Sequence, residues 1–203
     1  MKRNILGIML LLSVFIGFHG VDVLADEGTT DNEIRGSVDI FSNETNVSDV
    51  MNVNEIVSDL STREGISLEE AKEILFPGGN ISLLNDSTKA ATYRTITSNL
   101  PNSVGSVFYY CETSESGLFH AIQKVLHAGY NSGNKIYSGL FFYNLADPNR
   151  IDYILNGHLY NTGSTTISGG GEISVGESET ISVGISNTSD YYAPLYVSDS
   201  TNF

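Results

Sequence analysis

Two histidines are the first side chains in this sequence to consider as metal ligands. His120 and His127 lie seven residues apart, whereas a pair of zinc ligands on one helix is usually four residues apart. Two turns of helix would separate the rings by about 10 Å, and in a strand an odd spacing sends them to opposite faces. We therefore expect no shared metal site and interpret both rings as solvated.

The single cysteine, Cys111, is the candidate nucleophile, because it cannot close a disulfide within the chain. A thiol nucleophile would need a histidine, His158 or His127, with Asp152 to orient the ring. Catalytic thiols usually lie beside cationic groups that lower the thiol pKa. Cys111 instead precedes Glu112 in a run of β-branched and aromatic residues. We interpret it as a small buried apolar side chain.

Carboxylates are the next candidates, for glycosidase or calcium chemistry. A glycosidase needs two carboxylates at a fixed separation. The strand-rich half offers Glu112, Glu115, Glu172, Glu177 and Glu179. Asp147, Asn149 and Asp152 alternate around a turn, which suits a weak Ca²⁺ site, but no bidentate glutamate completes the loop. We interpret all of these as surface and turn residues, and expect no catalytic residue, metal or cofactor.

Tyrosine is the remaining clue to function. The chain has 11 tyrosines and no tryptophan, and an exposed tyrosine gives a large contact area at low entropic cost. The alternative is that these rings only fill half-buried strand positions. We expect Tyr191, Tyr192 and Tyr160 to contact a ligand, either an extracellular protein or a glycan.

The N-terminus has the parts of a secretory signal peptide. Lys2 and Arg3 precede an uncharged apolar stretch that is shorter than the roughly 20 residues of a membrane-spanning helix. Small residues then allow cleavage between Ala25 and Asp26. We predict that residues 1–25 are a signal peptide and that the protein is secreted, with no membrane span after cleavage. An uncleaved N-terminal anchor is the alternative.

The net charge restricts the partners. The chain carries 24 acidic and 10 basic side chains, a formal net charge of −14. Binding to nucleic acid requires a surplus of lysine and arginine to neutralise phosphate, so the composition argues against such a partner. The same charge disfavours docking on anionic membranes.

Helical patterns are confined to the segments that precede the strands. Residues 26–48 are polar and acidic, and we predict a disordered leader. Residues 49–76 have apolar side chains at helical spacing on both sides of a glycine, which predicts a helical hairpin. Ser67 and Glu70 form a capping box at the start of its second helix. Residues 77–91, rich in Gly, Asn and Ser, are the expected linker.

From residue 92 to 203 the pattern changes to short alternating strands separated by turn residues. This predicts a mainly β domain, an antiparallel β-sandwich or barrel. Residues 118–129 are the exception, because their polar residues recur at helical spacing opposite an apolar side. That pattern favours one short amphipathic helix, with a hairpin strand as the alternative.

Together these features favour a secreted, non-enzymatic extracellular β-domain that binds a surface ligand or a partner protein. One alternative is an antibacterial or toxin-like protein in which residues 26–90 are a removable pro-segment, and a hydrolase is another. A signal peptide, an acidic helical segment and a β-domain rich in Tyr, Asn and Gly are similar in general style to secreted proteins of Gram-positive bacteria. A similarity of style implies no activity.

Overall fold

The computed structural model describes residues 44–78, 91–161, 163–185 and 190–203. The predicted signal peptide and its cleavage site lie outside these ranges, as do most of the predicted leader and linker. Residues 45–47, which the sequence placed in the leader, form strand β1 (Thr45–Val47), which pairs with the edge of the first sheet.

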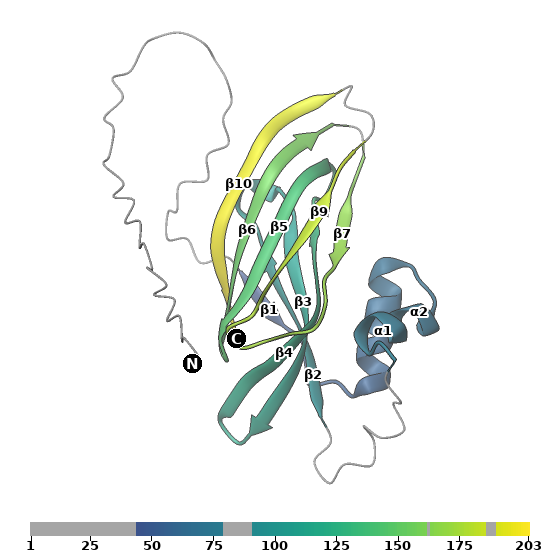
Figure 1. Ribbon diagram of the computed structural model, residues 1–203, viewed down its shortest axis with the longest axis vertical. Helices are drawn as coiled ribbons and strands as arrows, with labels where there is room; N and C mark the ends of the chain where they lie inside the picture. The colour runs from purple at the N-terminus through teal and green to yellow at the C-terminus, as the bar shows by residue number, and fades with distance from the viewer. Residues whose placement is uncertain (1–43, 79–90, 162, 186–189) are drawn as a thin grey trace, which may run out of the picture. The chain divides into compact units, whose positions relative to one another are not determined.

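Two short helices follow, α1 (Val53–Glu64) and α2 (Leu68–Leu75) (Figure 1). Gly65 ends α1 with a φ of 68°, a left-handed conformation that favours glycine. The predicted capping box is confirmed: Ser67 Oγ accepts a hydrogen bond from the Glu70 N–H, and the Glu70 carboxylate accepts the Ser67 N–H at 2.9 Å. The two helices therefore form a hairpin in which the capping box provides hydrogen-bond partners for backbone N–H groups at the start of α2.

The remaining described chain is arranged in two antiparallel sheets (Figure 1). In the first sheet, in the order β1-β2-β3-β4-β7 with β8 also paired to β4, the strands after β1 are β2 (Thr92–Asn99), β3 (Ser106–Ser116), β4 (Phe119–Asn131), β7 (Thr166–Gly169) and β8 (Ile173–Ser174). In the second sheet, in the order β10-β6-β5-β9, they are β5 (Ile136–Asp147), β6 (Arg150–Tyr160), β9 (Ser178–Val183) and β10 (Tyr191–Asn202). A short 3₁₀ helix, η1 (Pro101–Ser103), joins β2 to β3. The mainly β, antiparallel prediction is confirmed, and the sheets do not close into a barrel.

One hydrophobic core fills the space between the two sheets. The ring of Tyr109 in β3 contacts Phe141 and Tyr143 in β5, with centroid distances of 6.4 and 6.0 Å. Cys111 is fully buried in the same core, which confirms its interpretation as a small apolar side chain. The sandwich is thus held by aromatic contacts between sheets rather than by a disulfide.

A second cluster joins the helical hairpin to the outer face of the first sheet. Its buried apolar residues are Val53, Ile56, Val57, Leu60, Ala71, Leu75, Tyr93, Phe108, Tyr110 and Leu126. At its edge, the Tyr110 hydroxyl donates to Asp59 Oδ2 at 2.7 Å, and the guanidinium of Arg63 lies 4.8 Å from the centroid of the Phe108 ring. The hairpin is therefore a covering layer of the sandwich.

The helix favoured for residues 118–129 is wrong, because residues 119–129 belong to strand β4. The register with β3 leaves Gln123 and Leu126 without a partner of their own, so the strand contains two β-bulges. Each bulge shifts the alternation by one position. The side chains that face the second sheet consequently recur every three residues: Ile122, Val125 and Ala128. A spacing of three imitates the period of a helix.

Candidate functional site

The outer face of the second sheet carries aromatic and aliphatic side chains that point away from the hydrophobic core. Side chains alternate along each strand, so those next to the buried positions point outward. We call the outward residues of four cross-strand rows the open face: Tyr191, Tyr160 and Ile136; Pro194, His158 and Ser138; Tyr196, Asn156, Leu140 and Ser182; Ser198, Ile154, Phe142 and Thr180. The helical hairpin packs on the other sheet, and Tyr191, Tyr196 and Leu140 are 55%, 54% and 46% exposed.

Two of the three predicted ligand-binding residues lie side by side on the open face. The rings of Tyr160 and Tyr191 meet edge to face at 5.9 Å, and the His158 ring lies 5.8 Å from that of Tyr191. Tyr192 occupies the irregular position where the β10–β6 register shifts, with Lys135 Nζ 4.0 Å from its ring centroid. The fold therefore gathers these tyrosines at one end of the sheet.

Tyr196 and Leu140 belong to the same face and were not singled out from the sequence. Tyr196 is paired with Asn156, which is paired in turn with Leu140. The signal for Tyr196 was its alternation with the buried residues Ala193 and Leu195 in β10. Leu140 gave no such signal, because it lies within a nearly continuous apolar run and only the register shows which of its residues point outward.

The open face has no formally charged side chain with histidine neutral, although the whole chain has a net charge of −14. Charge appears only at its borders. At one end, Lys135 Nζ donates to Asn161 Oδ1 at 2.7 Å. At the other, Arg150 Nε lies 3.1 Å from Asp152 Oδ1. Between them the face runs from Ile154 to Tyr160, about 20 Å at roughly 3.4 Å per residue, and is about 14 Å wide at roughly 4.8 Å per strand.

The two candidate metal-binding histidines contact different parts of the fold. His127 is buried beneath α1, with its Nε2 3.0 Å from Glu64 Oε1. His120 is exposed and its ring lies 4.9 Å from that of Phe203, at the end of the second sheet's β10. The interpretation of His127 as solvated is wrong, because the helical hairpin covers that position through a contact between residues far apart in the sequence.

The cysteine nucleophile hypothesis fails on placement. Cys111 lies between the sheets, where burial raises the pKa of its thiol far above the ordinary value. His127 lies on the outer face of the first sheet and His158 on that of the second, so neither ring reaches the thiol. Asp152, the proposed orienting group, is paired with Arg150. A buried neutral thiol without a base is not a nucleophile.

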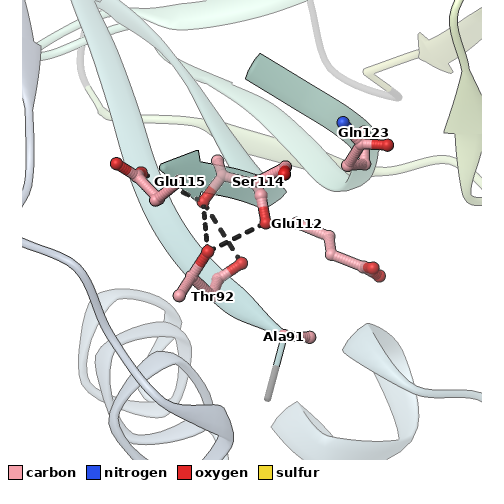
Figure 2. Close-up of a pocket in the computed structure, with 7 residues that line it drawn as sticks. Ala91, Thr92, Glu112, Ser114, Glu115 and Gln123 are labelled. Carbon is pink, nitrogen blue, oxygen red and sulfur yellow. Dashed lines mark hydrogen bonds between the residues drawn. The ribbon is translucent and has the colours of Figure 1, made fainter. Parts of the chain in front are cut away.

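Two candidate glycosidase carboxylates, Glu112 and Glu115, line a pocket of about 260 Å³ (Figure 2). Their side chains point away from each other in Figure 2, because they lie on opposite faces of β3. Glu115 receives a hydrogen bond from Arg94 Nε at 2.7 Å, which holds the pKa of this carboxyl below its ordinary value. Glu115 is thus held in an ion pair with Arg94, and its side chain is not directed toward that of Glu112, as the two carboxylates of a glycosidase must be.

The other three glutamates are engaged at the surface. Glu172 Oε1 lies 2.8 Å from Lys124 Nζ, and the Glu177 carboxylate accepts the Ser174 N–H at 2.7 Å. The Glu179 carboxylate accepts the Thr180 N–H at 3.0 Å. These contacts fit the interpretation of the glutamates as turn and surface residues.

The turn considered for calcium is occupied by an arginine. Arg150 Nε lies 3.7 Å from Asp147 Oδ2 and 3.1 Å from Asp152 Oδ1, and the Asn149 N–H donates to Asp147 Oδ1 at 2.9 Å. The guanidinium thus supplies the positive charge that a cation would supply. In the ranges that the structure describes, no group of three or more His, Cys, Asp or Glu side chains could hold a metal ion.

Glu64 gives a prediction for pH dependence. Burial by itself raises the pKa of this carboxyl. Hydrogen bonds with His127 and Ser168 lower the pKa by more than burial raises it, so the net pKa lies below the ordinary 4.5. A lowered folded-state pKa stabilises the protein above the unfolded value, and this stability is lost as pH falls through the folded value. At neutral pH, Glu64→Gln should therefore have a lower free energy of unfolding in urea than wild type. As the pH is lowered below 4.5, the free energy of unfolding of Glu64→Gln should fall by less than that of wild type. An acid limb identical to wild type would contradict this, and the exposed Glu69→Gln is the control.

Comparison of the chain with protein-family models, with curated proteins and with solved structures finds no match. Among the described residues, no helix is long and apolar enough to cross a membrane. The candidate chemical groups are buried, paired or separated from one another, whereas the open face presents exposed apolar side chains on the outer side of the second sheet.

Proposed function

We propose that this chain is an exported, non-enzymatic β-domain protein that binds its ligand on the open face of the second sheet. The observation that supports the proposal is the face itself, in which exposed aromatic and aliphatic side chains lie together without a formal charge on a strongly acidic protein. Contiguous apolar patches on soluble proteins commonly mark interaction sites.

Rigidity of the face adds to this support. The tyrosines project from strands β6 and β10, which are paired along nearly their whole length. Directly beneath the open face, Leu155, Leu159 and Leu195 are buried in the inter-sheet core. Side chains held by a packed scaffold lose little conformational entropy on binding, which favours affinity.

The state of the chemical groups favours binding over catalysis. Glu115 is held ionised by Arg94, and Cys111 is a buried neutral thiol. The antibacterial alternative, with residues 26–90 removed, would strip the helical hairpin from the first sheet and expose its apolar cluster. The packing of the hairpin therefore favours a mature protein that keeps it.

Retention on isolated cell walls of the source organism tests the proposal. The double substitution Tyr191→Ala/Tyr196→Ala should lower the affinity for the walls by roughly 10-fold or more, because exposed rings of this kind carry much of a binding energy. Leu118→Ala is the matched control: Leu118 is fully exposed at the turn between β3 and β4, away from the open face. Equal retention of the double variant and the wild type would refute the proposal.

A further inference from the structure

We propose that the ligand of the open face is an uncharged polysaccharide, whose sugar rings lie on the tyrosines and whose hydroxyls bond to the polar side chains between them. This inference rests on the proposed function and assigns the ligand class. The occupant is identified by the side chains that would recognise it.

The first argument is the alternation of rings with short polar groups. In the third row, the exposed amide of Asn156 lies between Tyr196 and Leu140, and Ser182 is paired beyond Leu140. A pyranose ring has an apolar C–H face, which packs on an aromatic ring, and hydroxyls around its edge. Asn donates and accepts hydrogen bonds, and Ser does so with one hydroxyl, so this row matches both features of a sugar.

The neighbouring rows add further apolar and hydrogen-bonding groups in other arrangements. His158 lies between Pro194 and Ser138, next to the paired rings of Tyr160 and Tyr191. The rows are successive along the strands, so apolar contacts and hydrogen-bonding groups continue over about 20 Å, at roughly 3.4 Å per residue. A face that offers apolar contacts and hydrogen-bonding groups over this length suits an extended polymer rather than a small molecule.

Charge is the second argument, and it decides against other polymers. A chain of net charge −14 repels polyanions, and the open face has no Lys or Arg to bind phosphate or carboxylate groups. Protein interfaces are enriched in Arg, Met, Trp and other aromatic residues. The open face shares the aromatic residues of such interfaces but has neither Arg nor Met, and its Ser, Thr and Asn side chains can donate hydrogen bonds to sugar hydroxyls and accept hydrogen bonds from them. An uncharged face complements an uncharged ligand.

The experiment uses the full-length secreted protein and the isolated cell walls of the retention assay. One portion of the walls is extracted with boiling detergent and digested with protease, which removes lipid and protein and leaves polysaccharide. Retention is measured on both portions at low salt and in 1 M NaCl, where the screening length is about 3 Å. Wild type, Asn156→Lys, Asn156→Asp and the control Leu118→Ala are compared.

An uncharged polysaccharide predicts retention that survives extraction, does not change with salt, and falls roughly 10-fold or more with either Asn156 substitution. Loss of retention on extracted walls would identify a protein or lipid ligand and overturn the inference, while the proposed function stands. Retention that falls in 1 M NaCl, or rises with Asn156→Lys, would identify an anionic polymer and overturn it as well. Wild-type protein that is not retained, or a tyrosine double variant retained equally, refutes the proposed function itself.

Discussion

A chain truncated to residues 91–203 is expected not to fold cooperatively. Truncation removes β1 and both helices, and it exposes the large apolar side chains that they cover: Tyr93, Phe108, Tyr110 and Leu126, all at most 3% exposed in the full chain. It also removes Asp59, which accepts the hydrogen bond of the buried Tyr110 hydroxyl. We expect a loss of the sigmoidal urea transition and of the near-ultraviolet signal of the tyrosines.

Two point substitutions test whether the loss of cooperative folding comes from the interface between the hairpin and the sheet or from shortening the chain. Leu60 is fully buried in the same interface, and Leu60→Ala should lower the free energy of unfolding by about 2–5 kcal/mol. Leu68 is 56% exposed on α2, and Leu68→Ala should change it by about 0.5 kcal/mol or less. Cooperative unfolding of residues 91–203, with Leu60→Ala near neutral, would show that the hairpin is separable and would favour the pro-segment alternative.

Phe141→Ala is expected to destabilise the protein by about 3–5 kcal/mol, the range for truncating a buried phenylalanine. Phe141 is fully buried between the sheets, and its ring lies 6.4 Å from that of Tyr109 and 5.4 Å from that of Tyr143. A cavity at this point removes contacts to both sheets at once. Urea unfolding monitored by circular dichroism measures the change.

The neighbouring residue on β5 is the control. Leu140 points to the open face and is 46% exposed, so Leu140→Ala should change stability by about 0.5 kcal/mol or less. The same substitution should lower retention on cell walls, because it removes an apolar group from the proposed binding row. If instead Leu140→Ala were the more destabilising of the two, the assignment of inner and outer faces would be wrong.

Local interactions were readable from the sequence. The capping box of Ser67 and Glu70 involves residues three positions apart, so its pattern is complete within one turn of helix. Strands such as β6 and β9 showed the period of two that comes from alternating inner and outer side chains. The burial of Cys111 followed from the apolar residues beside it. Tyr191 and Tyr160 were chosen by residue type, and the fold was needed to place them together.

Strand β4 shows where the sequence misleads. Its outer face is covered by helices and its inner face by the second sheet, so apolar residues occur on both sides and the period of two is lost. Two bulges then introduce a spacing of three. The prediction that His127 is solvated was wrong because the burial of its ring depends on a helix more than sixty positions away in the chain.

The sequence by itself determined the mainly β class, the helical hairpin and the charge that argues against anionic partners, because each depends on composition or on neighbours within a few positions. The tertiary structure alone decided which sheet the hairpin covers and therefore which one keeps an exposed outer face. That choice depends on long-range packing, in which Tyr93, Phe108 and Tyr110 are buried by α1 and α2 while Tyr191 and Tyr196 are not. Residues of the same type thus acquire opposite roles, since burial is a property of the whole fold.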